Sequence, residues 1–150
     1  MGFKFSLEKV LTQRKIKMDL AKKDYLESQD FLFEEQKKLD GLITQKEDAF
    51  RKRSDIIQSQ SNWHADVESI NQFLSGQDLR IAQQNERLIK IEKVVESRRE
   101  ILKECLIEVK IVEKLRANKK AEYLQEVDRK ERKEIDEISS IRFVRMTKNE

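Results

Sequence analysis

The fold of this chain follows from residues 67–112, which read VESINQFLSGQDLRIAQQNERLIKIEKVVESRREILKECLIEVKIV. Read in alternating steps of three and four residues, it keeps one stripe for more than six heptads without a change of phase. Ten of the fourteen stripe positions are aliphatic, which predicts one long helix that buries the stripe against a partner helix. The stripe consists of Val67, Ile70, Leu74, Gln77, Ile81, Gln84, Leu88, Ile91, Val95, Arg98, Leu102, Cys105, Val109 and Val112.

The composition favours long exposed helices over a thick globular core. Charged residues make up 41% of the 150 residues, and the chain has no proline and three glycines, so little interrupts a helix. No apolar run is long enough to cross a membrane, and the N-terminus lacks the apolar segment of a secretory signal. The single cysteine, Cys105, lies on the stripe as a small core residue. We expect one cytoplasmic domain spanning residues 1–150.

The first third of the chain can supply the partner helix. Its apolar residues also recur at heptad spacing, but their pattern shifts by one residue near Gly41, which predicts a local change of supercoil. The predicted stripe consists of Leu7, Leu11, Arg14, Met18, Ala21, Tyr25, Leu32, Leu39 and Leu42, followed after the shift by Ile43, Phe50 and Ile57.

Two places could hold the reversal between the helices: residues 59–62, and the Ser-Gly pair that ends at Gly76. The stripe passes through Gly76 unbroken, and a glycine inside a helix costs only about 1 kcal/mol. A tip near residue 61 sets Leu32 opposite Ile91, whereas a tip at Gly76 would set it opposite Lys119. Because apolar layers meet only in the first arrangement, we place the tip near residue 61.

The sequence therefore predicts an all-α fold, a long antiparallel two-helix coiled-coil hairpin. The first helix spans about residues 6–58, the turn about 59–63 and the second helix about 64–140, with a C-terminal overhang and fraying after about residue 138. Polar stripe residues such as Gln77, Gln84 and Arg98 would lower stability but fix the register. The same heptads also permit a coiled coil between chains, and that alternative stays open.

Catalytic chemistry is not expected. The only histidine, His64, lies at the predicted turn, on the order of 60 Å along the helices from Cys105 at about 1.5 Å per residue. A cysteine–histidine pair or metal site therefore cannot assemble in one chain. The chain has no glycine-rich phosphate loop. We predict a protein that is not an enzyme, with no catalytic residue, cofactor or metal.

The charges divide unevenly along the chain. Residues 1–23 hold seven basic and two acidic side chains and residues 116–150 hold ten and eight, whereas the remainder has four more acids than bases. The hairpin brings the first two segments to one end, and this basic end can dock on an acidic partner. Alternatively, its charges only keep an overhanging helix in water. Nucleic acid is not expected as a partner, because acids alternate with the bases and no aromatic platform accompanies them.

Two large aromatic residues lie beside the stripe or at the predicted turn. Phe73 directly precedes Leu74, at a flanking position that a helix pair covers only partly, and Trp63 lies at the turn. These side chains are either anchors for another protein or an apolar cap on this end of the hairpin.

Several local motifs resemble a known family. The string FKFSLEKVL at residues 3–11, the pair Arg14-Lys15, and Phe73-Leu74 followed by Ile81 and Gln84 are similar to the FliJ family of flagellar export proteins. The resemblance covers essentially the whole chain. It implies an antiparallel hairpin that serves as the stalk of the flagellar type III export apparatus, similar to the central shaft of rotary ATPases.

The resemblance also implies partners. Family members insert their terminal end into the ring of the export ATPase FliI, contact the export gate FlhA nearer the tip and escort export chaperones, so they reach the membrane complex only through proteins. The gate-binding aromatic of the family corresponds to Phe73, but a leucine common four residues later is Gln77 here. The predicted ATPase-binding residues are Lys9, Arg14, Lys15, Arg129, Lys130, Arg132 and Lys133. The predicted gate- and chaperone-binding residues are Phe50, Phe73, Leu74, Gln77 and Gln84. A coiled-coil scaffold or dimerisation protein without an ATPase partner is the alternative.

Overall fold

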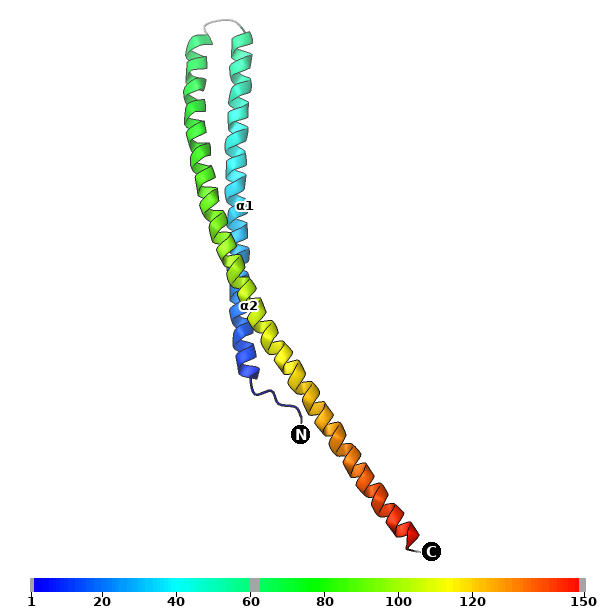
Figure 1. Ribbon diagram of the computed structural model, residues 1–150. Helices are drawn as coiled ribbons and strands as arrows, with labels where there is room; N and C mark the ends of the chain where they lie inside the picture. Colours follow the sequence, from blue (N-terminus) through cyan, green and yellow to red (C-terminus); the bar gives the residue numbers. More distant parts are fainter. Residues whose placement is uncertain (1, 60–62, 149–150) are drawn as a thin grey trace. The chain divides into compact units, whose positions relative to one another are not determined.

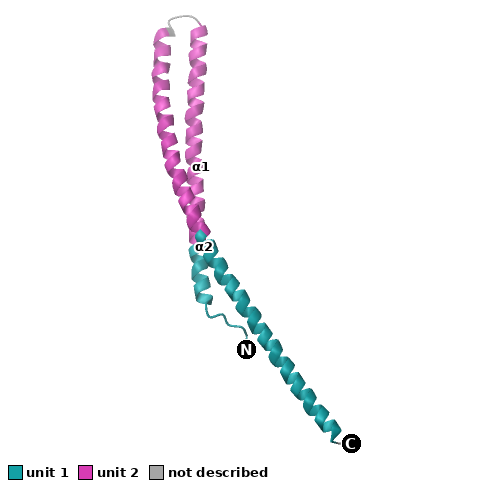
Figure 2. Ribbon diagram, in the orientation of Figure 1, with its two compact units in different colours: residues 1–18, 104–150 teal, residues 19–103 magenta. Residues whose placement is uncertain are grey.

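Two long helices make up the fold. The computed structural model describes residues 2–59 and 63–148, which contain α1 (Glu8–Gln58) and α2 (Trp63–Thr147) and no β-strand (Figure 1). The predicted all-α hairpin is confirmed. The chain divides into two compact units, Asp19–Lys103 and the pair Met1–Met18 with Glu104–Glu150 (Figure 2). We call the first the distal unit and the second the terminal unit. The expectation of a single domain stays a prediction.

The predicted place of the reversal is also confirmed. α1 ends at Gln58 and α2 begins at Trp63 and continues through Gly76 without a break. Residues 60–62 of the predicted turn, and the side chain of Trp63, lie outside the described residues. In the distal unit, Arg87 pairs with Glu35 and Arg98 donates to the carbonyl of Asp24, as a tip near residue 61 requires.

The predicted stripe of α2 is the face that packs against α1. All fourteen stripe positions are buried or half-buried in their own units. The buried members include Leu74, Leu88 and Cys105. The unbroken heptad pattern therefore predicted the packing face of α2 correctly, and Cys105 is a core residue, 3% exposed.

The predicted shift in the stripe of α1 is wrong. The buried and half-buried face keeps its phase past Gly41, whereas Ile43, Phe50 and Ile57 are 38%, 41% and 46% exposed. The physical reason is that small or polar side chains fill the seam, since Ala49 is buried and Arg53 donates to Asn71 at 3.0 Å. The observed face in the distal unit consists of Ala21, Tyr25, Ser28, Leu32, Glu35, Leu39, Leu42, Lys46, Ala49, Arg53 and Ile56.

The terminal unit holds a short apolar core and then a single helix. Leu11, Val109 and Val112 form a buried cluster, against which Phe5 and Met18 pack. Before α1 begins, the N-terminal segment also contacts α2, where the ring centroids of Phe3 and Tyr123 are 5.7 Å apart. Every described side chain from residue 128 to 148 is exposed. The predicted C-terminal overhang is confirmed, and we call residues 128–148 the overhang.

Both outer helix boundaries differ from the prediction. α1 begins at Glu8 rather than near residue 6, after a turn in which the Glu8 amide donates to the carbonyl of Phe5. α2 continues to Thr147 rather than ending near 140, so the predicted fraying after residue 138 is wrong as far as Thr147. The hydroxyls of Ser140 and Thr147 donate to carbonyls four residues earlier, and Arg145 lies in the last turn, where the helix dipole favours a cation.

Replacing Gly76 by alanine is expected to stabilise the protein by about 1 kcal/mol, because alanine is the better helix former and a Cβ at this position meets no atom within 4 Å. Chemical denaturation followed by circular dichroism measures the gain. Gly41→Ala is a matched variant on α1, where a Cβ also meets nothing. A loss of stability for Gly76→Ala would show that the position needs a glycine.

Candidate partner-binding surfaces

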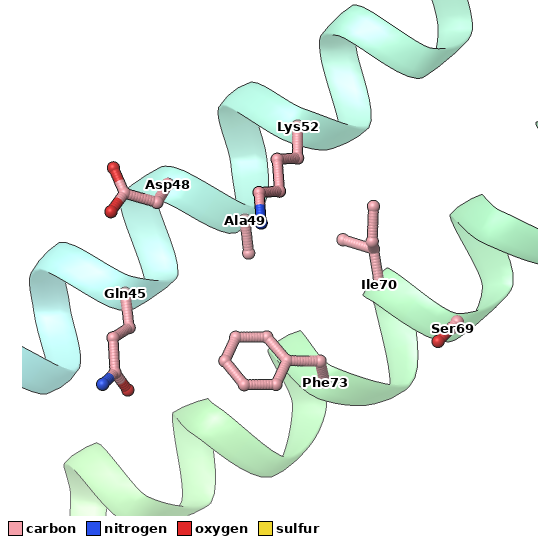
Figure 3. Close-up of a pocket in the computed structure, with 7 residues that line it drawn as sticks. All are labelled: Gln45, Asp48, Ala49, Lys52, Ser69, Ile70 and Phe73. Carbon is pink, nitrogen blue, oxygen red and sulfur yellow. The ribbon is translucent and has the colours of Figure 1, made fainter.

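Phe73 lines an open groove between the two helices of the distal unit. The groove has a volume of about 370 Å³, and Figure 3 shows Phe73 and Ile70 on α2 across from Gln45, Ala49 and Lys52 on α1. Phe73 is 40% exposed, so part of its ring reaches solvent. Because Ala49 is small, it leaves room beside the ring on the α1 side of the groove. An apolar side chain from a partner can therefore pack against the ring.

Phe50 lies on the opposite edge of the distal unit from Phe73. Its ring is 5.0 Å from the guanidinium of Arg53, which is itself bonded to Asn71. On the same edge, Lys46 pairs with Asp78 at 2.6 Å. Asn71 and Asp78 are seven residues apart on α2, at the heptad position that lies on the other side of the packing stripe from Phe73. The structure therefore does not bring the two predicted gate-binding aromatics together.

The other three predicted gate residues lie in or against the interior. Leu74 is 6% exposed and Gln77 is 0% exposed. The Nε2 of Gln77 donates to the carbonyl of Leu42 at 2.8 Å, and the Nε2 of Gln84 donates to the carbonyl of Glu35 at 2.9 Å. These side chains hold the helices together, and their role in binding a partner stays a prediction.

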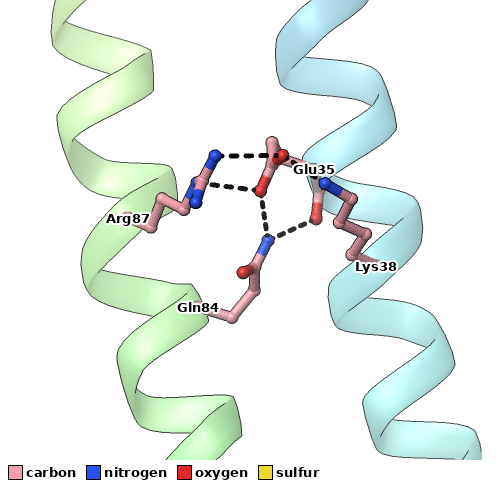
Figure 4. Close-up of polar contacts among 4 residues, drawn as sticks. All are labelled: Glu35, Lys38, Gln84 and Arg87. Carbon is pink, nitrogen blue, oxygen red and sulfur yellow. Dashed lines mark hydrogen bonds and ion pairs between the residues drawn. The ribbon is translucent and has the colours of Figure 1, made fainter.

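Glu35 is a buried charge that the sequence reasoning missed. Only 1% of its side chain is exposed, and its carboxylate accepts hydrogen bonds from Lys38 at 2.7 Å and from Gln84 at 2.9 Å (Figure 4). The Nε of Arg87 lies 3.0 Å from the same carboxylate. The signal in the sequence was its position, three residues after Leu32 and four before Leu39, which continues the unshifted heptad.

The hydrogen bond from Lys38 lowers the pKa of Glu35, and Gln84 and Arg87 lower it further, although burial acts in the opposite direction. A carboxyl whose pKa is lowered by folding stabilises the protein above its unfolded pKa of about 4.5, and this contribution disappears as the pH falls through the folded value.

Glu35→Gln is therefore expected to lower the melting temperature at neutral pH, and the gap from wild type is expected to narrow as the pH falls below about 4.5. Thermal melts from pH 3 to 7 measure this. Glu34→Gln is the matched control, because Glu34 is exposed and pairs only with Lys37 at 3.2 Å among the contacts of the described chain. A gap that does not change with pH would contradict the role of the Glu35 charge.

The predicted ATPase-binding residues of α1 lie beside α2 in the terminal unit. Arg14 is half-buried and donates to the carbonyl of Glu108 at 3.3 Å, and Lys15 pairs with Glu113 at 3.1 Å. Lys9 is exposed. Arg14 and Lys15 thus already hold α1 against α2, which leaves Lys9 as the most available cation of the three.

The four predicted residues of α2 lie on the overhang. All of them are exposed, and only Arg132 has an ion pair among the described residues, with Asp128 at 2.8 Å. Arg116, which pairs with Glu8 at the start of α1, precedes Arg129 by 13 residues, or about 20 Å of helix. The structure therefore separates these four residues from Lys9, Arg14 and Lys15.

Comparisons with known proteins identify the family to which this chain belongs. Among the helices described, none combines the length and apolarity needed to cross a membrane. No curated protein matches the sequence. The structure of a putative YscO homolog from Chlamydia trachomatis aligns with 93% of this chain and 94% of its own, at 23% identity and a TM-score of 0.46. The family model described as "Flagellar FliJ protein" matches residues 3–148. The chain therefore belongs to the FliJ family and is a component of flagellar protein export.

Proposed function

We propose that this protein is the non-enzymatic stalk of the flagellar type III export apparatus. Its terminal unit inserts into the ring of the export ATPase FliI, and its distal unit contacts the export gate FlhA. The observation that carries the proposal is the overhang, a helix whose described side chains from residue 128 to 148 are all exposed. A helix of this length that packs against none of the described residues of the chain is suited to entering another protein.

Charge supports the ATPase end of the proposal. Arg129, Lys130 and Lys133 are exposed, and the described residues give them no ion pair. Such side chains can form new ion pairs with acidic residues lining a ring without first breaking internal ones. Arg132 would exchange its exposed bond to Asp128, which costs little because exposed ion pairs are weak.

The groove beside Phe73 supports the gate end. Aromatic side chains are enriched in protein interfaces, and Phe73 has a half-exposed ring at the edge of an open groove. Leu74 and Gln77 are buried, and Gln77 bonds to α1 at Leu42, so they hold together the helix pair that carries Phe73. We assign the direct contact to Phe73 and treat Phe50, on the opposite edge, as a separate candidate.

The remaining parts of the proposal concern location and further partners. The protein acts in the cytoplasm and reaches the membrane complex only through FliI and FlhA. Export chaperones are further partners, and nucleic acid is not one, because acids alternate with bases along the overhang.

Assembly of FliI tests the proposal. Ring formation and ATP turnover of purified FliI, measured with and without the full-length protein, are expected to rise together when the protein is added. Sedimentation of the protein alone reports whether it is a monomer. Unchanged assembly and turnover, together with a stable dimer, would favour the coiled-coil scaffold instead.

Phe73→Ala is expected to weaken binding to the cytoplasmic part of FlhA by about tenfold or more and to leave helicity unchanged, because a half-exposed ring contributes little to the fold. Titration calorimetry and circular dichroism measure the two effects. Phe50→Ala tests the opposite edge. Phe33→Ala is the control, since Phe33 is 56% exposed and does not line the groove beside Phe73. Equal FlhA affinity for wild type and Phe73→Ala would reject this contact.

A further inference from the structure

A second groove in the distal unit is not used by the proposed ATPase and gate contacts. It has a volume of about 420 Å³ and lies between the helices, with Phe31 on α1 and Ile91 and Val94 on α2 as its apolar lining. Phe31 and Val94 are 47% and 48% exposed. Val94 follows Phe73 by 21 residues, or about 30 Å along α2, so the two grooves can hold different partners.

Cations dominate the rim of this groove. Arg87, Lys90 and Arg98 line it, together with one carboxylate, that of Glu27. Two of the cations are held in place by α1. The buried carboxylate of Glu35 fixes Arg87, whose guanidinium lies 6.0 Å from the centre of the Phe31 ring, and Arg98 donates to the carbonyl of Asp24 at 3.1 Å. Since these side chains are already ordered, a ligand need not order them on binding.

The third cation is available for a new ion pair. Lys90 is exposed, and the described part of the chain gives it no ion-pair partner. It lies one turn of α2 from Val94, so a carboxylate on a ligand that packs against Val94 is within reach of Lys90.

A groove on the opposite edge of the distal unit has the reverse charge. There, a groove of about 490 Å³ is lined by Leu39 and Ile89 and by two carboxylates, Asp40 and Glu92, and no cation lines it. The two grooves therefore both offer apolar side chains but carry opposite charge. An acidic ligand is attracted to the Phe31 groove and repelled by the Ile89 groove.

We infer that the Phe31 groove is a docking site for an acidic amphipathic helix, which lies along the hairpin as a third helix. Its apolar residues, spaced three and four apart, pack on Phe31, Ile91 and Val94. Its flanking carboxylates pair with Lys90 and with the ordered arginines. This site is separate from the FliI and FlhA contacts proposed above, so it remains testable if those contacts fail.

The test uses the full-length protein and two labelled synthetic helical peptides that share one leucine stripe, one flanked by glutamates and the other by lysines. Fluorescence anisotropy is expected to show binding of the acidic peptide and at least about tenfold weaker binding of the basic one. Phe31→Ala is expected to weaken acidic-peptide binding by about tenfold. Phe33→Ala is the matched control, an exposed phenylalanine on the same helix that does not line the groove.

A second pair of variants isolates the charge. Lys90→Glu and Lys93→Glu change the net charge equally, but only Lys90 lines the groove. Lys90→Glu alone is expected to weaken the acidic peptide about fivefold or more. The inference is overturned by equal binding of the two peptides, by absent binding of the acidic one, or by equal effects within either pair of variants. Self-association that Phe31→Ala abolishes would also overturn it, because a second copy would then occupy the groove.

Discussion

Replacing the four basic residues of the overhang with glutamate together is expected to reduce affinity for the FliI ring at least about 100-fold at physiological salt. Each side chain is exposed, and pairs of this kind contribute up to about 1 kcal/mol each, so four reversals combine to a large loss that repulsion increases further. Circular dichroism must show that the overhang stays helical, because the variant has an acidic side chain at every position from 128 to 134 and these side chains repel one another along the helix. The four residues are Arg129, Lys130, Arg132 and Lys133.

A matched variant separates this local effect from net charge. Four exposed lysines of the distal unit, changed to glutamate, also move the net charge from +3 to −5 but leave the overhang intact, so ring affinity should change less than about fivefold. Wild-type binding should weaken with added salt. Equal losses in both variants, or wild-type binding insensitive to salt, would show that the overhang charges do not contact the ring. The four control lysines are Lys37, Lys52, Lys93 and Lys103.

Leu11→Ala is expected to destabilise the terminal unit by about 2–5 kcal/mol, the cost of deleting a buried leucine side chain and leaving a cavity. Leu11 is 2% exposed and packs with Val109 and Val112, the three residues of the buried apolar cluster in this unit. Because this cluster is small, the start of α1 is expected to separate from α2.

Hydrogen exchange resolved by residue measures this change, with faster exchange expected in residues 8–18 and little change in the distal unit. Leu20→Ala is the control, because Leu20 is 59% exposed and its loss should cost less than about 1 kcal/mol. Equal destabilisation by the two variants would mean that the cluster around Leu11 does not hold the segments together.

The sequence predicted α2 better than α1 for a physical reason. Aliphatic residues mark most of the α2 seam, so heptad spacing alone finds the packing face from Val67 to Val112. In α1, the seam includes Glu35 and Lys46, whose charges are neutralised by partners on the same or the facing helix. A search for apolar residues passes over such positions and moves to exposed neighbours such as Phe50, which produced the wrong shift.

The candidate sites were predictable in residue type but not in placement. Sequence spacing indicated Phe73 as a flanking aromatic, and the structure leaves it half-exposed at a groove. Sequence spacing could not reveal that Phe50 faces the other edge, because the direction of Phe50 depends on the phase of the heptad pattern in α1. Nor could it reveal the Phe31 groove, because its ordered cations depend on contacts with Glu35 and with the carbonyl of Asp24.

The seam donors of α2 bind main-chain oxygens of α1, as Gln77 does at Leu42 and Arg98 does at Asp24. Every residue carries a carbonyl, so the acceptor persists whatever amino acid replaces Leu42 or Asp24, whereas replacing the donor removes the bond. These bonds should therefore restrict sequence variation at the donor positions of α2 but not at the acceptor positions of α1. Related chains should retain an amide or guanidinium at the α2 positions, whereas these bonds place no constraint on the side chain at the facing α1 positions, which packing alone restricts.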